Sequence, residues 1–171
     1  MPRHSTDQNT SRRPMRQDRL IRERIHDPYK LRQKLPEPTR CPRCGAVFEK
    51  GRWAWSRVPV TGAHEELCQA CHRIEDDYPA GEVHVRGAYV SDHKDEIVGL
   101  MRNIEQAENA EHPLNRIMRI DETDEGLVVK TTDIHLPHAI GHALNDAWDG
   151  ELAVHYDEEG YFARVEWRRD A

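Results

Sequence analysis

The chain has 171 residues, of which 37% are hydrophobic and 33% are charged, and its formal net charge is −6. This length suits one ordinary domain or two small ones, and the composition predicts a small core with some unstructured stretches. There is no run of eighteen apolar residues, the length that a membrane-spanning helix requires, and the first residues lack the apolar segment of a secretory signal. We therefore expect a cytoplasmic protein without a membrane partner.

Residues 1–40 are predicted to form a basic arm that is largely disordered alone, with a short helix over residues 17–25. The arm has eleven Lys/Arg and five Asp/Glu, a charge of +6, so the remaining 131 residues carry −12. A basic arm on an acidic body is typical of segments that bind nucleic acid, although a solubilising tail has the same composition. Arginine suits phosphate because its planar fork offers paired donors. The candidate RNA contacts are Arg12, Arg13, Arg16, Arg19, Arg22 and Arg24.

Residues 41–90 are predicted to form a zinc-binding module, because all four cysteines occur in two Cys-x-x-Cys pairs. In a reducing compartment such pairs are more often metal ligands than disulfides. Gly45 permits the left-handed backbone that follows a tight turn after the first pair. Four thiolates complete a tetrahedral zinc site and leave no position for water. We therefore predict one structural zinc, of the zinc-finger kind, with four ligands: Cys41, Cys44, Cys68 and Cys71.

Two other uses of these cysteines stay open at this point. Residues 68–72 match the haem-attachment pattern Cys-x-x-Cys-His, which requires export of the chain. A rubredoxin-like iron site is the second, because spacing alone does not separate iron from zinc.

Between the cysteine pairs we expect a hairpin over residues 46–67, with turn chemistry at residues 59–62 and with Trp53 and Trp55 on its strands. The tryptophans either stack on bases or cover the small metal core, and the second interpretation is favoured because buried aromatic area is scarce there. A further strand is predicted over residues 82–90.

A connecting helix is predicted over residues 91–112, with Ser91 as its N-cap. Ile97, Leu100, Met101 and Ile104 recur at helical spacing and form one apolar stripe that must be buried.

Residues 113–171 are predicted to fold as a ββαββ domain, with the helix running from Thr132 or Asp133 to Trp148. The expected fold class is thus α+β: a zinc module, a connecting helix and a four-stranded sheet domain behind a basic arm. Three histidines share one face of the last helix and either bind a metal or form an exposed polar face. The exposed face is favoured, because no motif such as His-Glu-x-x-His accompanies them. They are His135, His138 and His142.

Catalytic motifs such as a glycine-rich phosphate loop or a Gly-x-Ser-x-Gly elbow do not occur, and the metal site uses every cysteine. We therefore expect a non-catalytic protein without a small-molecule substrate.

Four stretches resemble a known family: residues 41–45 (CPRCG), 68–71 (CQAC), 95–103 (DEIVGLMRN) and 131–136 (TTDIHL). They resemble bacterial relatives of the large-ribosomal-subunit export adaptor, the nonsense-mediated decay protein three family, over roughly residues 18–169. Members in eukaryotes and archaea bind the intersubunit side of the large subunit, use zinc modules as structure and are not catalytic.

The resemblance implies a bacterial, ribosome-associated, RNA-binding factor with ribosomal RNA or the large subunit as its partner. It would act in assembly or on idle subunits. The chain is much shorter than the long family members, and a bacterium has no nuclear export, so the export role does not carry over. The alternative is a cytoplasmic protein-interaction or regulatory adaptor with a structural zinc and no RNA binding.

Overall fold

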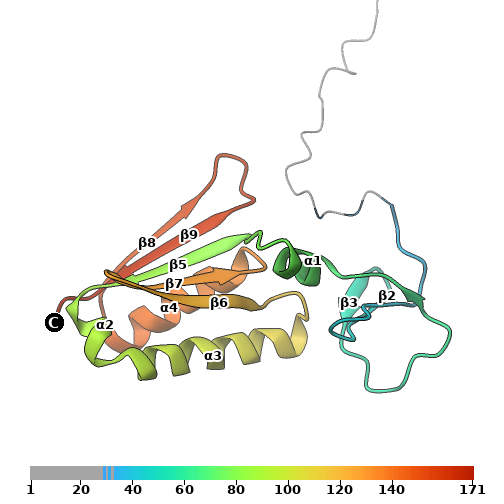
Figure 1. The fold of residues 1–171 in the computed structure, drawn as a ribbon, viewed down its shortest axis with the longest axis horizontal. Helices are drawn as coiled ribbons and strands as arrows, with labels where there is room; N and C mark the ends of the chain where they lie inside the picture. Colours follow the sequence, from blue (N-terminus) through green and yellow to red (C-terminus); the bar gives the residue numbers. More distant parts are fainter. Residues whose placement is uncertain (1–28, 30, 32) are drawn as a thin grey trace, which may run out of the picture.

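The computed structural model describes residues 29, 31 and 33–171, and every structural statement below concerns these residues. They form a small four-stranded sheet at one end of the molecule and a five-stranded sheet covered by helices at the other (Figure 1). This arrangement confirms the α+β class. The six candidate RNA-binding arginines and the helix expected over residues 17–25 lie outside the described residues.

The small sheet has the strand order β3-β2-β1-β4. Lys50 and Gly51 join β2 to β3, and both have positive φ angles, 54° and 77°, as a two-residue hairpin turn requires. The hairpin is therefore tighter than expected, and its turn precedes residues 59–62. The four strands are β1 (Thr39–Arg40), β2 (Val47–Glu49), β3 (Arg52–Ala54) and β4 (His64–Glu65).

The folded part of this module begins before the first cysteine. Strand β1 lies between β2 and β4 in the small sheet, although residues 39–40 were assigned to the disordered arm. Leu35 and Thr39 are buried, and the Tyr29 hydroxyl donates to an Asp76 carboxylate oxygen at 2.7 Å. The boundary of the arm therefore moves toward the N-terminus.

The large sheet has the order β6-β7-β5-β9-β8. Its central strand β5 pairs antiparallel with β7 and parallel with β9, so residues 81–86 belong to this sheet and not to the zinc module. The expected ββαββ unit is present as β6, β7, α4, β8 and β9, with β5 inserted between its two hairpins. The strands are β5 (Gly81–Arg86), β6 (Ile117–Thr123), β7 (Gly126–Thr131), β8 (Glu151–Tyr156) and β9 (Ala163–Arg168).

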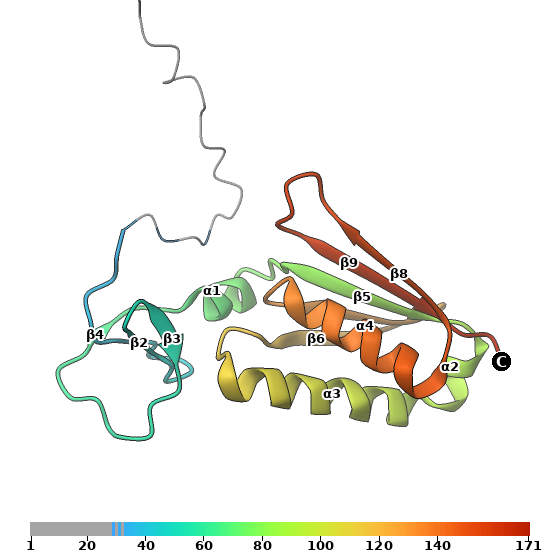
Figure 2. The same cartoon turned by 180° about the vertical axis from the view of Figure 1, so that it is seen from behind.

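Helices α3 (Lys94–Glu111) and α4 (His135–Trp148) cover one face of the large sheet (Figures 1 and 2). The main core lies between them and β5, β7 and β9, with Val85, Val129 and Trp167 fully buried. Within the apolar stripe of α3, Ile97 and Met101 are fully buried, and Leu100 and Ile104 pack at the edge of the core. The predicted stripe is confirmed.

The role and the start of this helix were not predicted correctly. Helix α3 packs beside α4 as part of the sheet domain and does not link two separate modules. Ser91 is not its N-cap, because Ser91 lies in the short helix α2 (Ala88–Asp92) and α3 begins at Lys94. Asp95 and Glu96 still lie in the first turn of α3, where negative charge is favourable.

The opposite face of the large sheet carries polar and charged side chains that pair both along and across strands. Glu82 on β5 contacts His84 at 3.0 Å and Arg164 of β9 at 3.6 Å, and Arg86 contacts Glu166 at 3.7 Å. This face is polar and needs no apolar partner. In the described part of the chain, no helix is both long and apolar enough to cross a membrane.

Candidate metal centre

The four cysteines lie together at the junction of the small sheet and helix α1 (Gln69–Glu75). Their Sγ atoms all lie within 4.8 Å of one another. Cys41, Cys68 and Cys71 are fully buried, and Cys44 is partly exposed. The two Cys-x-x-Cys pairs, separated by residues 45–67, therefore form one four-sulfur cluster, as the sequence predicted.

The first pair sits in a tight turn that directs both sulfurs to one side. The Gly45 N–H donates to the Cys41 carbonyl at 2.9 Å, and the Cys41 N–H donates to the Ala46 carbonyl at 2.8 Å. Gly45 has a φ of 82°, which a residue with a side chain adopts only with strain.

The second pair is built by the start of α1. Cys68 is the N-cap, and its sulfur accepts from the Cys71 N–H at 3.5 Å. The Cys68 N–H in turn donates to the Cys41 sulfur at 3.4 Å, which ties the two pairs together. Backbone donors aimed at sulfur favour the thiolate form that a metal needs.

This donor set fits a tetrahedral metal ion with four sulfur ligands. Zn–S bonds of about 2.3 Å in tetrahedral geometry place sulfurs roughly 3.8 Å apart. The Cys44 and Cys68 sulfurs are 3.8 Å apart. All four sulfurs converge on one point, so Cys68 and Cys71 form part of a four-cysteine site and not a separate haem-attachment pair.

Charge is distributed unevenly over the four thiols. The hydrogen bond between Cys68 and Cys44 lowers the pKa of Cys44 and raises that of Cys68. Burial raises the pKa of Cys71, against the effect of the nearby Arg116 guanidinium. These shifts favour the thiolate form of Cys44, the most exposed of the four.

Arg116 is a site residue that the sequence did not single out. It lies just before β6, in the sheet domain, and its Nη2 donates to the Cys68 sulfur at 3.3 Å. Its two terminal nitrogens also contact the Cys71 sulfur, at 3.5 and 3.6 Å. Burial opposes the charge of Arg116, but the hydrogen bonds and charges of the cysteines outweigh it and raise the pKa of the guanidinium. No spacing or motif marks this arginine among the others of the chain.

Apolar side chains enclose the cluster from both sides. Trp53 of β3 and Leu114 of the sheet domain pack against the buried cysteines, and Trp53 also meets the Phe48 ring edge-on at 5.6 Å. Trp55 is partly exposed, and its indole N–H donates to the Asn109 carbonyl of α3 at 2.6 Å. Trp53 thus covers the metal core, as the favoured interpretation required, and Trp55 joins the module to the sheet domain.

The three histidines of α4 do not converge on a metal position. All three side chains are exposed. His138 and His142 contact each other through their Nε2 atoms at 3.1 Å, and the His135 backbone N–H donates to Asp133. Among the described residues, the four cysteines are the group whose ligand atoms lie close enough together to hold a metal ion, and the histidines are not part of such a group. The exposed polar face expected for these histidines is confirmed.

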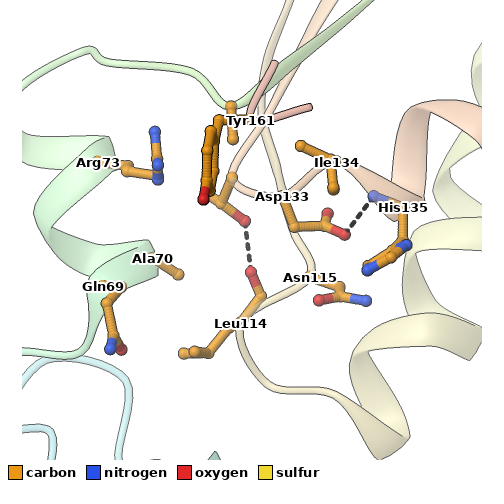
Figure 3. A pocket seen from close by; sticks show the side chains of 11 residues that line it. Gln69, Ala70, Arg73, Leu114, Asn115, Asp133, Ile134, His135 and Tyr161 are labelled. Atoms are coloured by element: carbon orange, nitrogen blue, oxygen red, sulfur yellow. Dashed lines mark hydrogen bonds between the residues drawn. The ribbon is translucent and has the colours of Figure 1, made fainter. Parts of the chain in front are cut away.

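A cavity of about 350 Å³ lies between α1 and the sheet domain, next to the metal centre (Figure 3). Gln69 and Arg73 line one side, and Asp133, His135 and Tyr161 line the other. Asp133 Oδ2 accepts from the N–H groups of His135 and Leu136 at 2.8 and 3.2 Å, so this carboxylate caps α4. Burial raises the pKa of Asp133. The place of the Asp133 carboxylate in the cavity wall is explained by its hydrogen bonds to the start of α4.

Comparisons with known proteins add no relative: no protein-family model, no curated protein and no solved structure matches this chain.

Proposed function

We propose that this chain is a non-catalytic zinc-binding factor that associates with the ribosome through ribosomal RNA, in assembly or on idle subunits. The observation that carries the proposal is the closed cluster of four cysteine sulfurs. A metal ion with four sulfur ligands has no position for water or substrate, so such an ion stabilises the fold and performs no chemistry. Among the residues that the structure describes, the core around the cysteines has only four buried members, so this part of the fold depends on stabilisation by the metal.

Zinc is the metal that we assign to the cluster. A four-thiolate tetrahedral site suits zinc and also iron, and the two are separated by measurement. Metal analysis of the purified protein should give about one zinc per chain, as a single closed site requires. A colourless protein with zinc supports the assignment. Iron in its place, or four free thiols without metal, would contradict it.

The RNA part of the proposal rests on charge and on the family resemblance. Residues 1–40 carry +6 and the remaining 131 residues carry −12. An acidic body repels phosphate, so RNA binding must come through the arm. Six arginines lie between residues 12 and 24 with only two acidic residues among them, Asp18 and Glu23.

Co-sedimentation with isolated large ribosomal subunits tests this role, using the full chain and a form that lacks residues 1–28. The deletion stops at residue 28 because Tyr29 contacts Asp76 next to α1, and Leu35 and Thr39 are buried. Removing residues 29–40 as well would damage the zinc module and confuse loss of the arm with loss of the fold. We expect the full chain to sediment with the subunit and the shortened chain to remain at the top of the gradient.

Matched triple variants separate specific arm contacts from total charge. Arg12→Ala, Arg13→Ala and Arg16→Ala change the arm. The control changes three exposed, ion-paired arginines of the body, Arg102→Ala, Arg164→Ala and Arg168→Ala. With ribosomal RNA as ligand, log Kd should depend linearly on log salt, and each lost phosphate contact should reduce that slope by roughly 0.7–0.9. The arm variant should show the flatter slope, and the control should match the wild type.

The outcomes distinguish the two candidate functions. Unchanged sedimentation of the chain without residues 1–28 at every salt concentration would remove the arm from the proposal. No sedimentation of the full chain would overturn ribosome association. In that case the acidic body favours the alternative, an adaptor for a basic protein partner.

A further inference from the structure

We propose that Arg116 is the counter-charge of the metal centre, a positioning residue through which the sheet domain completes the site. Metal affinity and the docking of the small sheet on the large domain then depend on each other. The inference rests on metal binding by the four cysteines and is independent of ribosome association.

The first step is charge. A divalent ion with four thiolates has a net charge of −2, and three of the four cysteines are fully buried. Burying uncompensated charge is costly unless a partner of opposite sign lies close. The Arg116 guanidinium, in contact with the sulfurs of Cys68 and Cys71, reduces the net charge to −1. The charges that favour the Arg116 guanidinium come from the cysteines, so the sulfurs are its anionic partners.

The second step is preorganisation. The Arg116 Nε donates to the Pro113 carbonyl at 2.9 Å, which holds the guanidinium in place. Its backbone N–H donates to Thr132 Oγ1 at 3.0 Å, and its carbonyl accepts from the Thr132 N–H at 2.9 Å. Thr132 is itself buried. The donor fork is therefore fixed by the sheet domain before a metal binds, and little side-chain entropy is lost on forming the N–H···S bonds.

The third step is the division of the site between two parts of the chain. Cys68 and Cys71 lie at the start of α1, which continues through a short loop into the central strand β5. Arg116 and Leu114 attach this half of the cluster to the sheet domain. Cys41 and Cys44 lie in the turn between β1 and β2 of the small sheet. A metal ion between the two cysteine pairs thus fastens the small sheet to the large domain.

Reciprocity follows from this geometry. Whatever free energy the Arg116 contact contributes to metal binding, the metal contributes equally to docking. Removing a partner just outside the ligand shell of a metal typically weakens binding by about 10–100-fold. We expect a loss of that size when Arg116 loses its charge and fork.

The experiment measures zinc affinity of the full chain by competition with a chromophoric chelator. Arg116→Gln should raise the Kd for zinc about 10–100-fold. The matched control is Arg168→Gln, which changes the net charge equally at the far end of the sheet, where Arg168 pairs with Asp170. This control should bind zinc as the wild type does. A Kd for Arg116→Gln within about twofold of wild type, or an equal loss in Arg168→Gln, would overturn the proposal.

The cobalt-substituted protein gives a second readout that a merely structural role would not move. N–H···S bonds lower the energy of the sulfur lone pairs, so their loss should shift the sulfur-to-cobalt charge-transfer band to longer wavelength in Arg116→Gln. If that variant does not fold, Arg116→Lys carries the test, because it keeps the charge and loses the two-donor fork. A wild-type zinc affinity together with a wild-type cobalt band in Arg116→Lys would then count against the proposal.

Docking is followed by amide hydrogen exchange. In the wild type, zinc should slow amide exchange in residues 108–117, the segment around Arg116. The reason is that the metal fixes Cys68 and Cys71, whose sulfurs accept hydrogen bonds from Arg116. In Arg116→Gln this zinc-dependent difference should shrink. An equal difference in both proteins would show that docking is independent of Arg116.

Discussion

Exposure is uneven among the four cysteines, and this sets the order in which the cluster should react. Cys44 is partly exposed, whereas Cys41, Cys68 and Cys71 have no exposed surface. The hydrogen bond with Cys68 also lowers the pKa of Cys44, so its thiolate form persists at lower pH. The thiolate is the reactive species toward alkylating agents and oxidants. Cys44 therefore combines access and reactivity.

We predict that limiting iodoacetamide modifies Cys44 first in the zinc-loaded protein, as peptide mass spectrometry would show. While the site is intact, Cys44 is partly exposed and the other three ligands are fully buried. The chelated protein is the control: because its small sheet opens, Cys41 should then react together with Cys44, and the preference for Cys44 should disappear. First modification at Cys68 or Cys71 would contradict the structure of the cluster.

Asp133 gives a second prediction at this scale, because its carboxylate accepts the first two free N–H groups of α4. Asp133→Ala should lower the free energy of unfolding by about 0.5–2 kcal/mol, the usual cost of losing an N-cap. Asp133→Asn should cost only a few tenths, since asparagine also caps. Urea unfolding of the zinc-saturated protein measures both. The exposed Asp146→Ala, on the same helix, is the control and should stay within about 0.5 kcal/mol of wild type.

Residue patterns in the sequence identified some of these positions and missed others for a physical reason. The cysteine pairs were recognisable because metal ligation imposes a short local spacing. Asp133 was one of two candidates for the helix start because capping is also local. The contact of Arg116 with Cys68 spans 48 positions along the chain. Only the tertiary fold creates this contact, and the sequence around Arg116 contains no pattern that predicts it.

The same difference between local patterns, which the sequence shows, and tertiary contacts, which it does not show, applies to whole helices and strands. Alternating apolar residues at 83 and 85 identified a strand, and the stripe of α3 identified a helix with a buried side. Pairing partners are not encoded in such periodicities. Strand β5 follows the metal module in sequence but lies between β7 and β9, so its assignment to that module was wrong. A strand buried on its inner face by Val83 and Val85 needs the large core, which the small sheet does not offer.

The β6–β7 hairpin depends on a glycine where β7 begins. Gly126 has a φ of 143°, and a Cβ there would lie 2.0 Å from the Val85 carbonyl oxygen on the neighbouring central strand. Neither backbone can move without disturbing the sheet. Gly126→Ala should therefore destabilise the protein by at least about 2–3 kcal/mol, through both steric overlap and backbone strain.

Gly160, in the turn before β9, is the matched control for that prediction. Its φ of 74° is also positive, but a Cβ there meets no atom within 4 Å. Gly160→Ala should cost only the backbone strain, roughly 1–2 kcal/mol. Thermal unfolding of the two variants compares them directly. Equal losses would mean that β5 and β7 can separate enough to accept a side chain.

On the scale of the whole molecule, the two folded parts are stabilised by different means. The large domain has thirteen buried core residues, including Trp167, Met101 and Leu136. The core between the small sheet and α1 is a cluster of four buried residues, and three of those are cysteines of the candidate metal centre. Hydrophobic burial therefore supports the large domain without help, whereas the small sheet depends on the metal.

Removing the metal should consequently unfold only one end of the molecule. A strong chelator should release fast amide exchange in strands β1 to β4, residues 39–65, and leave β5, β7 and β9 protected. The near-ultraviolet signal of Trp167 should persist, since this side chain is fully buried in the metal-independent core.

Cys44→Ser should reproduce the loss of protection in β1 to β4, because it removes one metal ligand. Restoring zinc to the wild type should restore protection in β1 to β4, because the large domain retains Arg116 and the second cysteine pair in place for the metal. Loss of protection in both sheets together would instead show that the metal holds the entire fold.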